Sequence, residues 1–271
     1  MGISHGEASG AGSRERIAAL SWWHTIEVAP GLVTPGSWEL RHAARRMPWP
    51  DLAGARCLDI GTMDGFWAFE MERRGAAEVL AIDLTDPARH DPPPALGVNR
   101  GASPRQPSPR ASPRPTFQLA AEILGSRVAY REMNVYDLRP EEVGSFDLVF
   151  LGYVLEFLRD PFRALEAIRG VCRGHLIVLD VVSFGLSLYP GPLAKVADRP
   201  GFGDWFVFNA EGLRRTVAAA GFEVDAESPW LRYGKGPALP WRTVPLGTIL
   251  AHTVGWKGCS RAVRGRVRPA P

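Results

Sequence analysis

The strongest constraint on the fold is a short apolar run that leads directly into a turn containing two glycines. Residues 55–60 are predicted to form a buried strand, and the turn after them runs from Gly61 to Gly65. A helix is predicted next, with Asp64 as its N-cap and with four large apolar side chains, Phe66, Trp67, Phe69 and Met71. A strand, a tight turn and a helix in succession are typical of one unit of a parallel α/β sheet.

The rest of the chain repeats this alternation. Strands are predicted at residues 79–82, 128–133, 147–151 and 175–182. Helices are predicted at residues 117–124, closed by Gly125, and at residues 209–220, capped by Asn209 and stopped by Gly221. Residues 222–224 and 248–254 are predicted to add a final antiparallel pair. The sequence therefore predicts an α/β fold with an open, doubly wound, mostly parallel sheet.

One further helix has a clear start signal. Asp160 is a predicted N-cap, and Pro161 occupies the first helical position. Gly170 is predicted to lie just past the end of this helix, and one face is predicted to carry Phe162, Leu165 and Ile168.

Two segments interrupt the pattern. Residues 1–14 are small and polar and are predicted to be disordered. Residues 87–116 contain nine prolines and are predicted to be a disordered insertion, because proline suits neither a helix interior nor a central strand. A polyproline segment that binds a partner protein is the alternative for this insertion.

Positive charge is concentrated in two segments. The chain has a formal net charge of +3, while residues 87–116 carry five arginines against one acid and residues 255–271 carry five basic residues and no acid. The remainder is therefore acidic, which argues against a folded surface that grips a polyphosphate. An arginine-rich tail could still supply attraction to a nucleic acid.

Composition excludes several other classes of protein. Over 271 residues, 45% hydrophobic and 23% charged residues are typical of a globular chain. Three widely spaced cysteines and histidines without ligand spacing predict no metal site and fit a reducing compartment. No apolar run approaches the roughly 20 residues of a membrane span, and no signal peptide is evident. A cytoplasmic protein without a membrane partner is expected.

The glycine turn also carries a chemical signal. Its pattern is D-x-G-x-x-x-G, from Asp59 to Gly65, and not the G-x-G-x-x-G of dinucleotide-binding folds. A fixed negative charge at Asp59 disfavours a phosphate and suits an amino group. Asp83 ends the next strand, where it can accept both hydroxyls of a ribose. S-adenosylmethionine, a nucleoside with an ammonium and a sulfonium, fits these acids. The alternative is that the glycines are ordinary turn residues and Asp83 caps a strand.

This turn and the segment GAAEVLAIDL after it resemble the class I S-adenosylmethionine-dependent methyltransferases. Other segments resemble the branch that contains the tRNA wobble-uridine (carboxy)methyltransferase: Trp23-His24-Thr25-Ile26, GTMDGFWAFEMERRGA, MNVYDL, VLEFLRDPFRAL and W-F-V-F-N-A-E-G-L. The resemblance implies a seven-stranded Rossmann-like methyltransferase domain at residues 51–254. An N-terminal lid or substrate segment would occupy residues 15–50, and a basic C-terminal tail residues 255–271.

The resemblance also implies the residues that bind the cofactor. They are Asp59, Gly61, Thr62, Met63, Gly65, Asp83, Leu84, Asn134, Val135 and Leu151. The methionine end would lie on the glycine turn, the ribose at Asp83, and the adenine beside Asn134 and Val135. Leu151, Gly152 and Tyr153 would approach the sulfonium and the incoming nucleophile.

This chain departs from the tRNA enzyme at two places. Where that enzyme has V-L-Y-H, residues 154–157 are V-L-E-F, and residues 22–47 contain no lysine that could pair with a carboxylated cofactor. Both departures favour plain methyl transfer over carboxymethyl transfer.

Methyl transfer depends on alignment of the reactants and, for a hydroxyl nucleophile, on a general base. The candidates are His24, which precedes the core where this fold usually builds a lid, and Tyr153 and Glu156 near the tip of the fourth strand. The structural alternatives are that His24 is a packing residue and that Glu156 faces solvent. Asp180, in a buried strand, requires a partner. The candidates for stacking on a planar acceptor, with core packing as the alternative, are Trp22, Trp23 and Trp205.

Together these features predict an enzyme that transfers a methyl group from S-adenosylmethionine to an oxygen or nitrogen of a small molecule, such as a natural-product or sugar intermediate. The first alternative is a tRNA wobble-uridine methyltransferase that uses its basic segments as electrostatic tethers. The second is a catalytically silent methyltransferase-like protein with a binding role.

Overall fold

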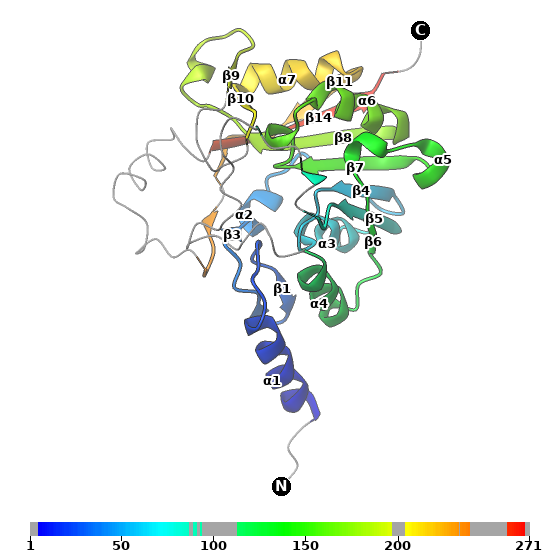
Figure 1. The fold of residues 1–271 in the computed structure, drawn as a ribbon, viewed down its shortest axis with the longest axis vertical. Helices are drawn as coiled ribbons and strands as arrows, with labels where there is room; N and C mark the ends of the chain where they lie inside the picture. Colours follow the sequence, from blue (N-terminus) through cyan, green and yellow to red (C-terminus); the bar gives the residue numbers. More distant parts are fainter. Residues whose placement is uncertain are drawn as a thin grey trace.

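A central β-sheet with helices on both faces forms the body of the protein (Figure 1). The computed structural model describes residues 5–86, 89–90, 93, 113–196, 204–232, 234–238 and 259–268. One apolar core lies on the sheet face covered by α3 (Phe66–Arg73) and α4 (Arg114–Leu124). A second core lies under α6 (Pro161–Val171) and α7 (Ala210–Ala219) on the other face. The sheet is therefore buried on both sides, as its continuous apolar strands require.

The sheet has the strand order β11-β14-β8-β7-β4-β5-β6. Its strands are β4 (Arg56–Ile60), β5 (Glu78–Asp83), β6 (Ala129–Glu132), β7 (Phe146–Gly152), β8 (Cys172–Val181), β11 (Phe222–Glu227) and β14 (Cys259–Val267). The pairs from β6 to β8 are parallel, and β14 runs antiparallel to both of its neighbours. A short strand, β12 (Leu231–Arg232), also pairs with β14. The predicted doubly wound, seven-stranded, mostly parallel sheet is confirmed.

The order of the strands reverses between β4 and β7. From β4 the chain proceeds outward to β5 and β6, and it then returns to the other side of β4 to form β7. Open α/β sheets bind their ligands outside the carboxyl ends of the strands at such a switch point. The turn from Gly61 to Gly65 follows β4 directly and therefore lies at this position.

Most predicted helix ends are confirmed. The side chain of Asp160 accepts a hydrogen bond from the backbone of Arg163, and that of Asn209 accepts one from Gly212. Gly125 closes α4 with a left-handed backbone. The prediction that Phe162 lies on the buried face of α6 is wrong, because this side chain is 48% exposed. The prediction that Gly170 lies past the end of this helix is also wrong, because α6 continues to Val171. The buried face of α6 is formed instead by Pro161, Ala164, Leu165, Ile168 and Val171.

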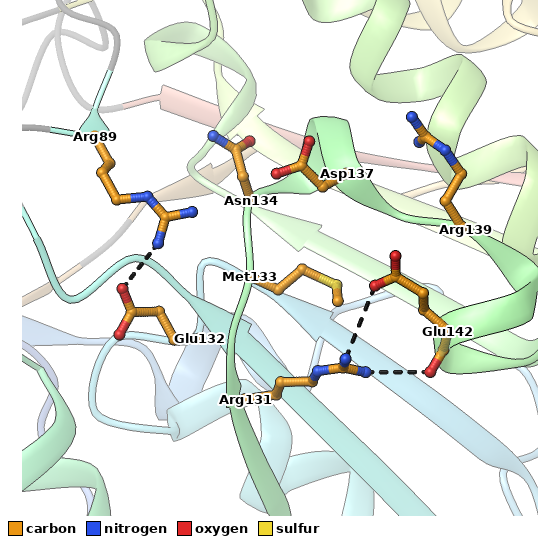
Figure 2. Close-up of a pocket in the computed structure, with 8 residues that line it drawn as sticks. All are labelled: Arg89, Arg131, Glu132, Met133, Asn134, Asp137, Arg139 and Glu142. Atoms are coloured by element: carbon orange, nitrogen blue, oxygen red, sulfur yellow. Dashed lines mark hydrogen bonds and ion pairs between the residues drawn. The ribbon is translucent and has the colours of Figure 1, made fainter.

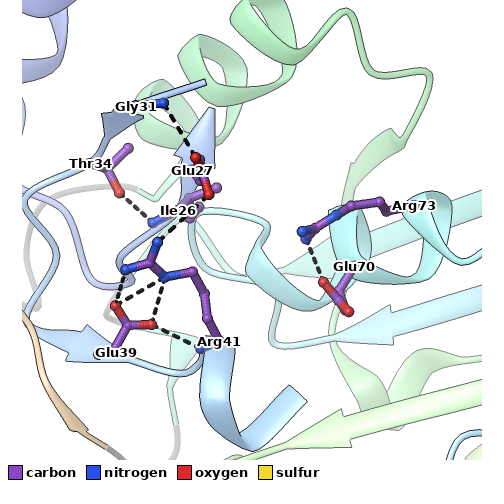
Figure 3. A network of polar contacts seen from close by, with 8 residues as sticks. All are labelled: Ile26, Glu27, Gly31, Thr34, Glu39, Arg41, Glu70 and Arg73. Atoms are coloured by element: carbon purple, nitrogen blue, oxygen red, sulfur yellow. Dashed lines mark hydrogen bonds and ion pairs between the residues drawn. The ribbon is translucent and has the colours of Figure 1, made fainter. Parts of the chain in front are cut away.

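The N-terminal part of the chain folds against the body. It contains α1 (His5–Ala18), β1 (Glu27–Ala29), β2 (Leu32–Val33), β3 (Trp38–Glu39) and α2 (Arg41–Ala44). The predicted disorder of residues 1–14 is wrong for residues 5–14, because these form most of α1. From a distant part of the chain, β13 (Gly234–Lys235) pairs with β3. Figure 3 shows how Arg41 links Glu39 to Glu27 and so ties β3 to β1.

The shorter elements lie mainly at the carboxyl edge of the sheet. Three are 3-10 turns, η3 (Val135–Asp137), η4 (Leu155–Phe157) and η5 (Leu186–Leu188). The others are helix α5 (Pro140–Val143) and a hairpin of β9 (Ala194–Val196) and β10 (Phe206–Phe208).

The prediction of a basic tail is wrong at residues 259–267. These residues form β14, which lies between β8 and β11 and takes the place predicted for residues 248–254. Residues 248–254 lie outside the described part of the chain. The arginines of β14 pair with acids of β11: Arg261 with Glu227, Arg264 with Asp225 and Arg266 with Glu223. The positive charge of this segment is therefore largely matched within the sheet.

The predicted insertion lies mostly outside the described residues. Its end is an exception, because α4 begins at Arg114, with Pro115 in its first turn. Proline is compatible with this position, since the first backbone N–H groups of a helix have no partner within the helix.

The position of β14 leads to a stability prediction. Val263 is completely buried in the sheet, whereas Arg266 on the same strand is exposed. We expect Val263→Asp to lower the free energy of unfolding by about 3 kcal/mol or more, because it buries a carboxyl without a partner. Arg266→Gln should change it by less than about 0.5 kcal/mol. Chemical denaturation measures both free energies of unfolding. If Val263→Asp lowered the free energy no more than Arg266→Gln does, the segment would be a tail and not a strand of the sheet.

Candidate functional site

The ends of three neighbouring strands meet at the glycine turn. Residues 59 and 60 of β4 lie beside residues 81 and 82 of β5 and residues 150 and 151 of β7. The backbone N–H of Gly61 donates to Ile82 at 2.9 Å, and that of Met63 donates to the Asp83 carboxylate at 2.6 Å. The turn is thus fixed to the end of β5, and the sequence-predicted residues of β4 and β5 come together.

Two non-glycine residues at this edge have a left-handed backbone. Met63 in the turn has φ 51° and Tyr153 after β7 has φ 57°. Such a backbone costs about 1–3 kcal/mol in a residue with a side chain and is concentrated at functional sites. The N–H of Tyr153 donates to Leu179 of β8 at 2.7 Å, which holds this residue in place.

Gly65 begins α3 with a backbone that favours glycine. Its φ is 93°, and a Cβ at this position would approach the rings of Phe69 and Phe117 to within 3 Å. Gly65 is the N-cap residue of α3, so the prediction that Asp64 caps this helix is wrong. Asp64 points instead toward the N-terminal segment.

The carboxylate of Asp64 binds that segment at three points. Oδ2 accepts the backbone N–H groups of Trp23 and His24 at 2.8 and 2.9 Å. Oδ1 contacts Nδ1 of the His24 ring. Both side chains are buried, and the His24 ring also packs against Phe66 at 5.8 Å between centroids. His24, a predicted catalytic residue, is thereby held directly on the glycine turn.

The Asp59 carboxyl is buried at the end of β4, and its Oδ2 has no hydrogen-bond partner among the described residues. Burial is the main cause that raises the pKa of Asp59, to about 7, and the neighbouring Asp83 carboxylate raises it further. Hydrogen bonds from Thr62 and from the backbone of Ala68 oppose the shift of this pKa, but the free Oδ2 remains costly to bury unless a cation comes to it. The amino group of a ligand would supply that cation.

Asp83 carries most of the hydrogen bonds at the end of β5. Its Oδ1 accepts from the backbone of Leu84 at 2.7 Å, while Oδ2 holds Met63. Burial raises the pKa of Asp83 as well, although these two N–H groups oppose the shift. The predicted cofactor residues Asp83, Leu84 and Met63 are therefore linked to one another.

A pocket of about 420 Å³ lies beside β6 and η3. Figure 2 shows Asn134 and Asp137 on one side of this pocket, and Arg89 paired with Glu132 on the other. The Asn134 side chain also accepts the backbone N–H of Tyr136, so it begins η3. Val135 is buried in the core behind it. Asn134, the residue predicted to flank the adenine, therefore lines a pocket close to Asp83.

Residues after β7 are positioned by a buried acid on β8. The Asp180 carboxylate accepts the N–H of Glu156 at 3.2 Å, and the Glu156 carbonyl accepts the N–H of Trp205 at 2.8 Å. Burial is the main cause that raises the pKa of Asp180 to about 7. Glu156 is itself buried, so the alternative that it faces solvent is wrong. Leu151 is completely buried at the end of β7.

The predicted stacking residues differ in position. Trp22 is completely buried and donates its Nε1–H to Ile17 at 2.8 Å, so its prediction as a substrate contact is wrong. Trp23 is only partly buried, and its ring lies edge-on to Trp38 at 6.4 Å. Trp205 is also partly buried and lies near Arg159.

Sequence reasoning missed two residues near this edge. Trp67 of α3 has a buried Nε1–H without a partner, and a Cβ at Gly152 would lie 3.2 Å from that nitrogen. Lys235 on β13 lies beside Trp38, so a lysine from a distant part of the chain reaches the N-terminal strands. The apolar helix pattern concealed Trp67, and β13 is too short to give a sequence signal.

The described residues contain neither a metal-binding cluster nor a membrane-spanning helix. No cluster of three or more histidine, cysteine or acidic residues in this part of the chain is placed to hold a metal ion. Among the described helices, no segment is both long and apolar enough to cross a membrane.

Comparison with known families shows the family of this chain. The family described as a methyltransferase domain matches residues 38–227. The chain belongs to this family. The matched range includes β3, the glycine turn, Asp83 and the sheet as far as β11, so it contains most of the residues described above.

Curated relatives match a part of this range. Ubiquinone biosynthesis O-methyltransferases from Xanthomonas euvesicatoria and Xanthomonas oryzae are 31% identical over 155 residues, which cover 56% of this chain and 53% of each relative. The chain thus spans about half the length of these relatives.

Solved structures share the fold at low sequence identity. The N-terminal domain of EvdMO1, solved with S-adenosylhomocysteine and D-fucose, has a TM-score of 0.54 at 17% identity and covers 96% of this chain and 97% of its own. The [4+2]-cyclase SpnF has a TM-score of 0.52 at 18% identity, with 84% and 80% covered.

The family match confirms the predicted class, a methyltransferase. The solved structure of the EvdMO1 N-terminal domain contains S-adenosylhomocysteine, the product form of the predicted cofactor. The Rossmann-like fold is confirmed by the sheet order and by these structures. The narrower resemblance to the tRNA wobble-uridine branch stays a prediction, as does the role of each site residue.

The raised pKa of Asp59 predicts a pH dependence of cofactor binding. Above about pH 7 the carboxyl is ionised and can accept the ammonium; below that pH a proton must leave first. We expect the affinity for S-adenosylhomocysteine to fall up to about tenfold per pH unit below about pH 7. In Asp59→Asn the affinity should be lower above pH 7 and its pH slope smaller. Calorimetric titration measures both; equal slopes would exclude Asp59 as the ammonium partner.

Proposed function

We propose that this protein transfers a methyl group from S-adenosylmethionine to an oxygen or nitrogen of a small-molecule acceptor, with His24 as the general base. The observation that carries the proposal is the buried contact between His24 and Asp64, which joins the N-terminal segment to the cofactor turn. A histidine that only filled space in the core would not require a buried carboxylate on its ring.

The residues of the turn fit the cofactor. The unpaired oxygen of Asp59 would receive the ammonium of its methionine part, and Asp83 would receive the ribose hydroxyls. Asn134 and its pocket would face the adenine. These assignments agree with the positions that the family resemblance implies.

When bound, the cofactor supplies a methyl group on a positively charged sulfur. The acceptor atom forms a bond to the methyl carbon while the carbon–sulfur bond breaks, so the two partners have to be aligned. Because Nδ1 of His24 is engaged by Asp64, its Nε2 remains to take the proton of the acceptor. Asp64 then stabilises the charged ring that forms.

Two observations favour a small acceptor over tRNA. The arginines of β14, which the tRNA alternative would use as a tether, are paired with acids of β11. The curated relatives are named as O-methyltransferases of ubiquinone biosynthesis. Basic side chains bind RNA by neutralising its phosphates, and arginines that are already paired with acids are less available for this.

Calorimetric titration with S-adenosylmethionine and S-adenosylhomocysteine tests the proposal against the alternative of a silent binding protein. We expect micromolar binding by the wild type and at least about tenfold weaker binding by Asp83→Asn, since a hydrogen bond to a charged group contributes about 1.5–3 kcal/mol. Asn keeps the size of Asp but leaves one of the two backbone N–H groups at this carboxylate without an acceptor, so melting curves are needed to show that the variant remains folded. A wild type that binds neither ligand would refute the proposed function.

The His24–Asp64 contact predicts a separate effect on turnover. With an acceptor in hand, His24→Gln should lower kcat about 10²–10⁴-fold, the usual contribution of a general base. Asp64→Asn should also lower kcat, and the affinity for S-adenosylhomocysteine should change little in His24→Gln. Single-turnover rates give the result; unchanged rates in His24→Gln would assign the histidine to packing.

A further inference from the structure

Three residues form a row across the N-terminal strands. His24 bridges Trp38 in parallel register, and Trp38 pairs with Lys235 of β13 in antiparallel register. Residues directly opposite each other in adjacent strands extend their side chains from the same face. Lys235 thus lies on the face from which His24 reaches Asp64, two strand spacings or roughly 10 Å away.

The Lys235 ammonium is held in an unusual environment. Its Nζ lies 4.0 Å from the centroid of the Trp38 ring, and Trp38 in turn contacts Trp23. Burial lowers the pKa of Lys235, and no charged group opposes that shift. Within the described part of the chain, Lys235 has no carboxylate partner.

The contact with Trp38 compensates the charge of the Lys235 ammonium only in part. A lysine usually keeps its ammonium in water and buries only its alkyl stem. Contact with an indole face recovers about 0.5–2 kcal/mol of the interaction that is lost with water. A carboxylate would recover more, because hydrogen bonds between charged groups are stronger than those between neutral ones.

The strands beneath Lys235 are firmly held. Figure 3 shows that Arg41 binds Glu39, the residue next to Trp38, and that Thr34 accepts a hydrogen bond from Ile26. Thr34 also donates to the His24 carbonyl at 2.7 Å. A Cβ at Gly234 would lie 3.1 Å from Glu39, so β13 and β3 approach closely. The ammonium is therefore presented at a defined distance from the base.

We propose that Lys235, seated on Trp38, binds a carboxylate of a ligand at the methyltransferase site. This inference rests on the proposed function. Two sources share that chemistry: the carboxylate of the cofactor's methionine part and a carboxylate on the acceptor. In both cases the ligand lies on the face that carries His24 and Asp64, and the Trp38 ring forms an apolar wall beside it.

The test compares Lys235→Met, which keeps the length of the side chain, with Lys235→Arg, which keeps its charge. Calorimetry measures the affinity of each protein for S-adenosylhomocysteine and for its decarboxylated analogue, 5′-S-(3-aminopropyl)-5′-thioadenosine. A second titration adds 4-hydroxybenzoate or the neutral 4-hydroxybenzamide to protein saturated with S-adenosylhomocysteine. Melting curves show whether both variants remain folded.

Loss of about tenfold or more in affinity for S-adenosylhomocysteine by Lys235→Met, with none for the decarboxylated analogue, assigns the carboxylate to the cofactor. An unchanged affinity for S-adenosylhomocysteine with loss of the preference for 4-hydroxybenzoate over the amide assigns it to the acceptor. Lys235→Arg should retain most of the affinity in either case.

The inference is wrong if Lys235→Met binds S-adenosylhomocysteine and 4-hydroxybenzoate as tightly as the wild type does. It is also wrong if the wild type binds neither of these carboxylates more tightly than the matching compound without the carboxylate. Binding of S-adenosylhomocysteine by the wild type tests the proposed function separately.

Discussion

The carboxylate of Asp64 joins the two halves of the site. It lies in the cofactor turn and receives two backbone N–H groups and the ring of His24 from the N-terminal segment. A buried carboxylate loses much of its hydration, and charge-assisted hydrogen bonds of this kind compensate for it. Asp64 thereby attaches the row from His24 to Lys235 to the turn at its His24 end.

Most of the sheet could be predicted because its central strands carry their own signal. Strands β5, β7 and β8 each contain a continuous apolar run, and Asn209 and Asp160 mark helix starts by local chemistry. The last strand was misassigned because β14 alternates arginines with small and apolar residues, so its charge concealed a buried position. Its partners, the acids of β11, come from a distant part of the sequence, and no local pattern reveals such pairing.

The site was predictable where it depends on the turn and less so where it depends on distant contacts. Asp59 and Asp83 follow from their places at strand ends and Asn134 from the family resemblance, and the structure brings them to one edge. The direction of Asp64 could not be predicted, because an acid before a helix is usually its cap. Trp22 was misassigned for a similar reason: neighbouring tryptophans look alike in sequence, but only one of them is in the core.

The central position of β14 has a consequence for synthesis. A ribosome releases this strand after all the others of the sheet, yet β11 pairs with no other strand of the sheet. Until residues 259–267 emerge, β8 exposes an open edge, and β11 with α7 cannot dock on it. Open edges invite pairing with other chains. The nascent protein therefore depends on rapid synthesis of its last strand, or on a chaperone, to protect the open edge of β8.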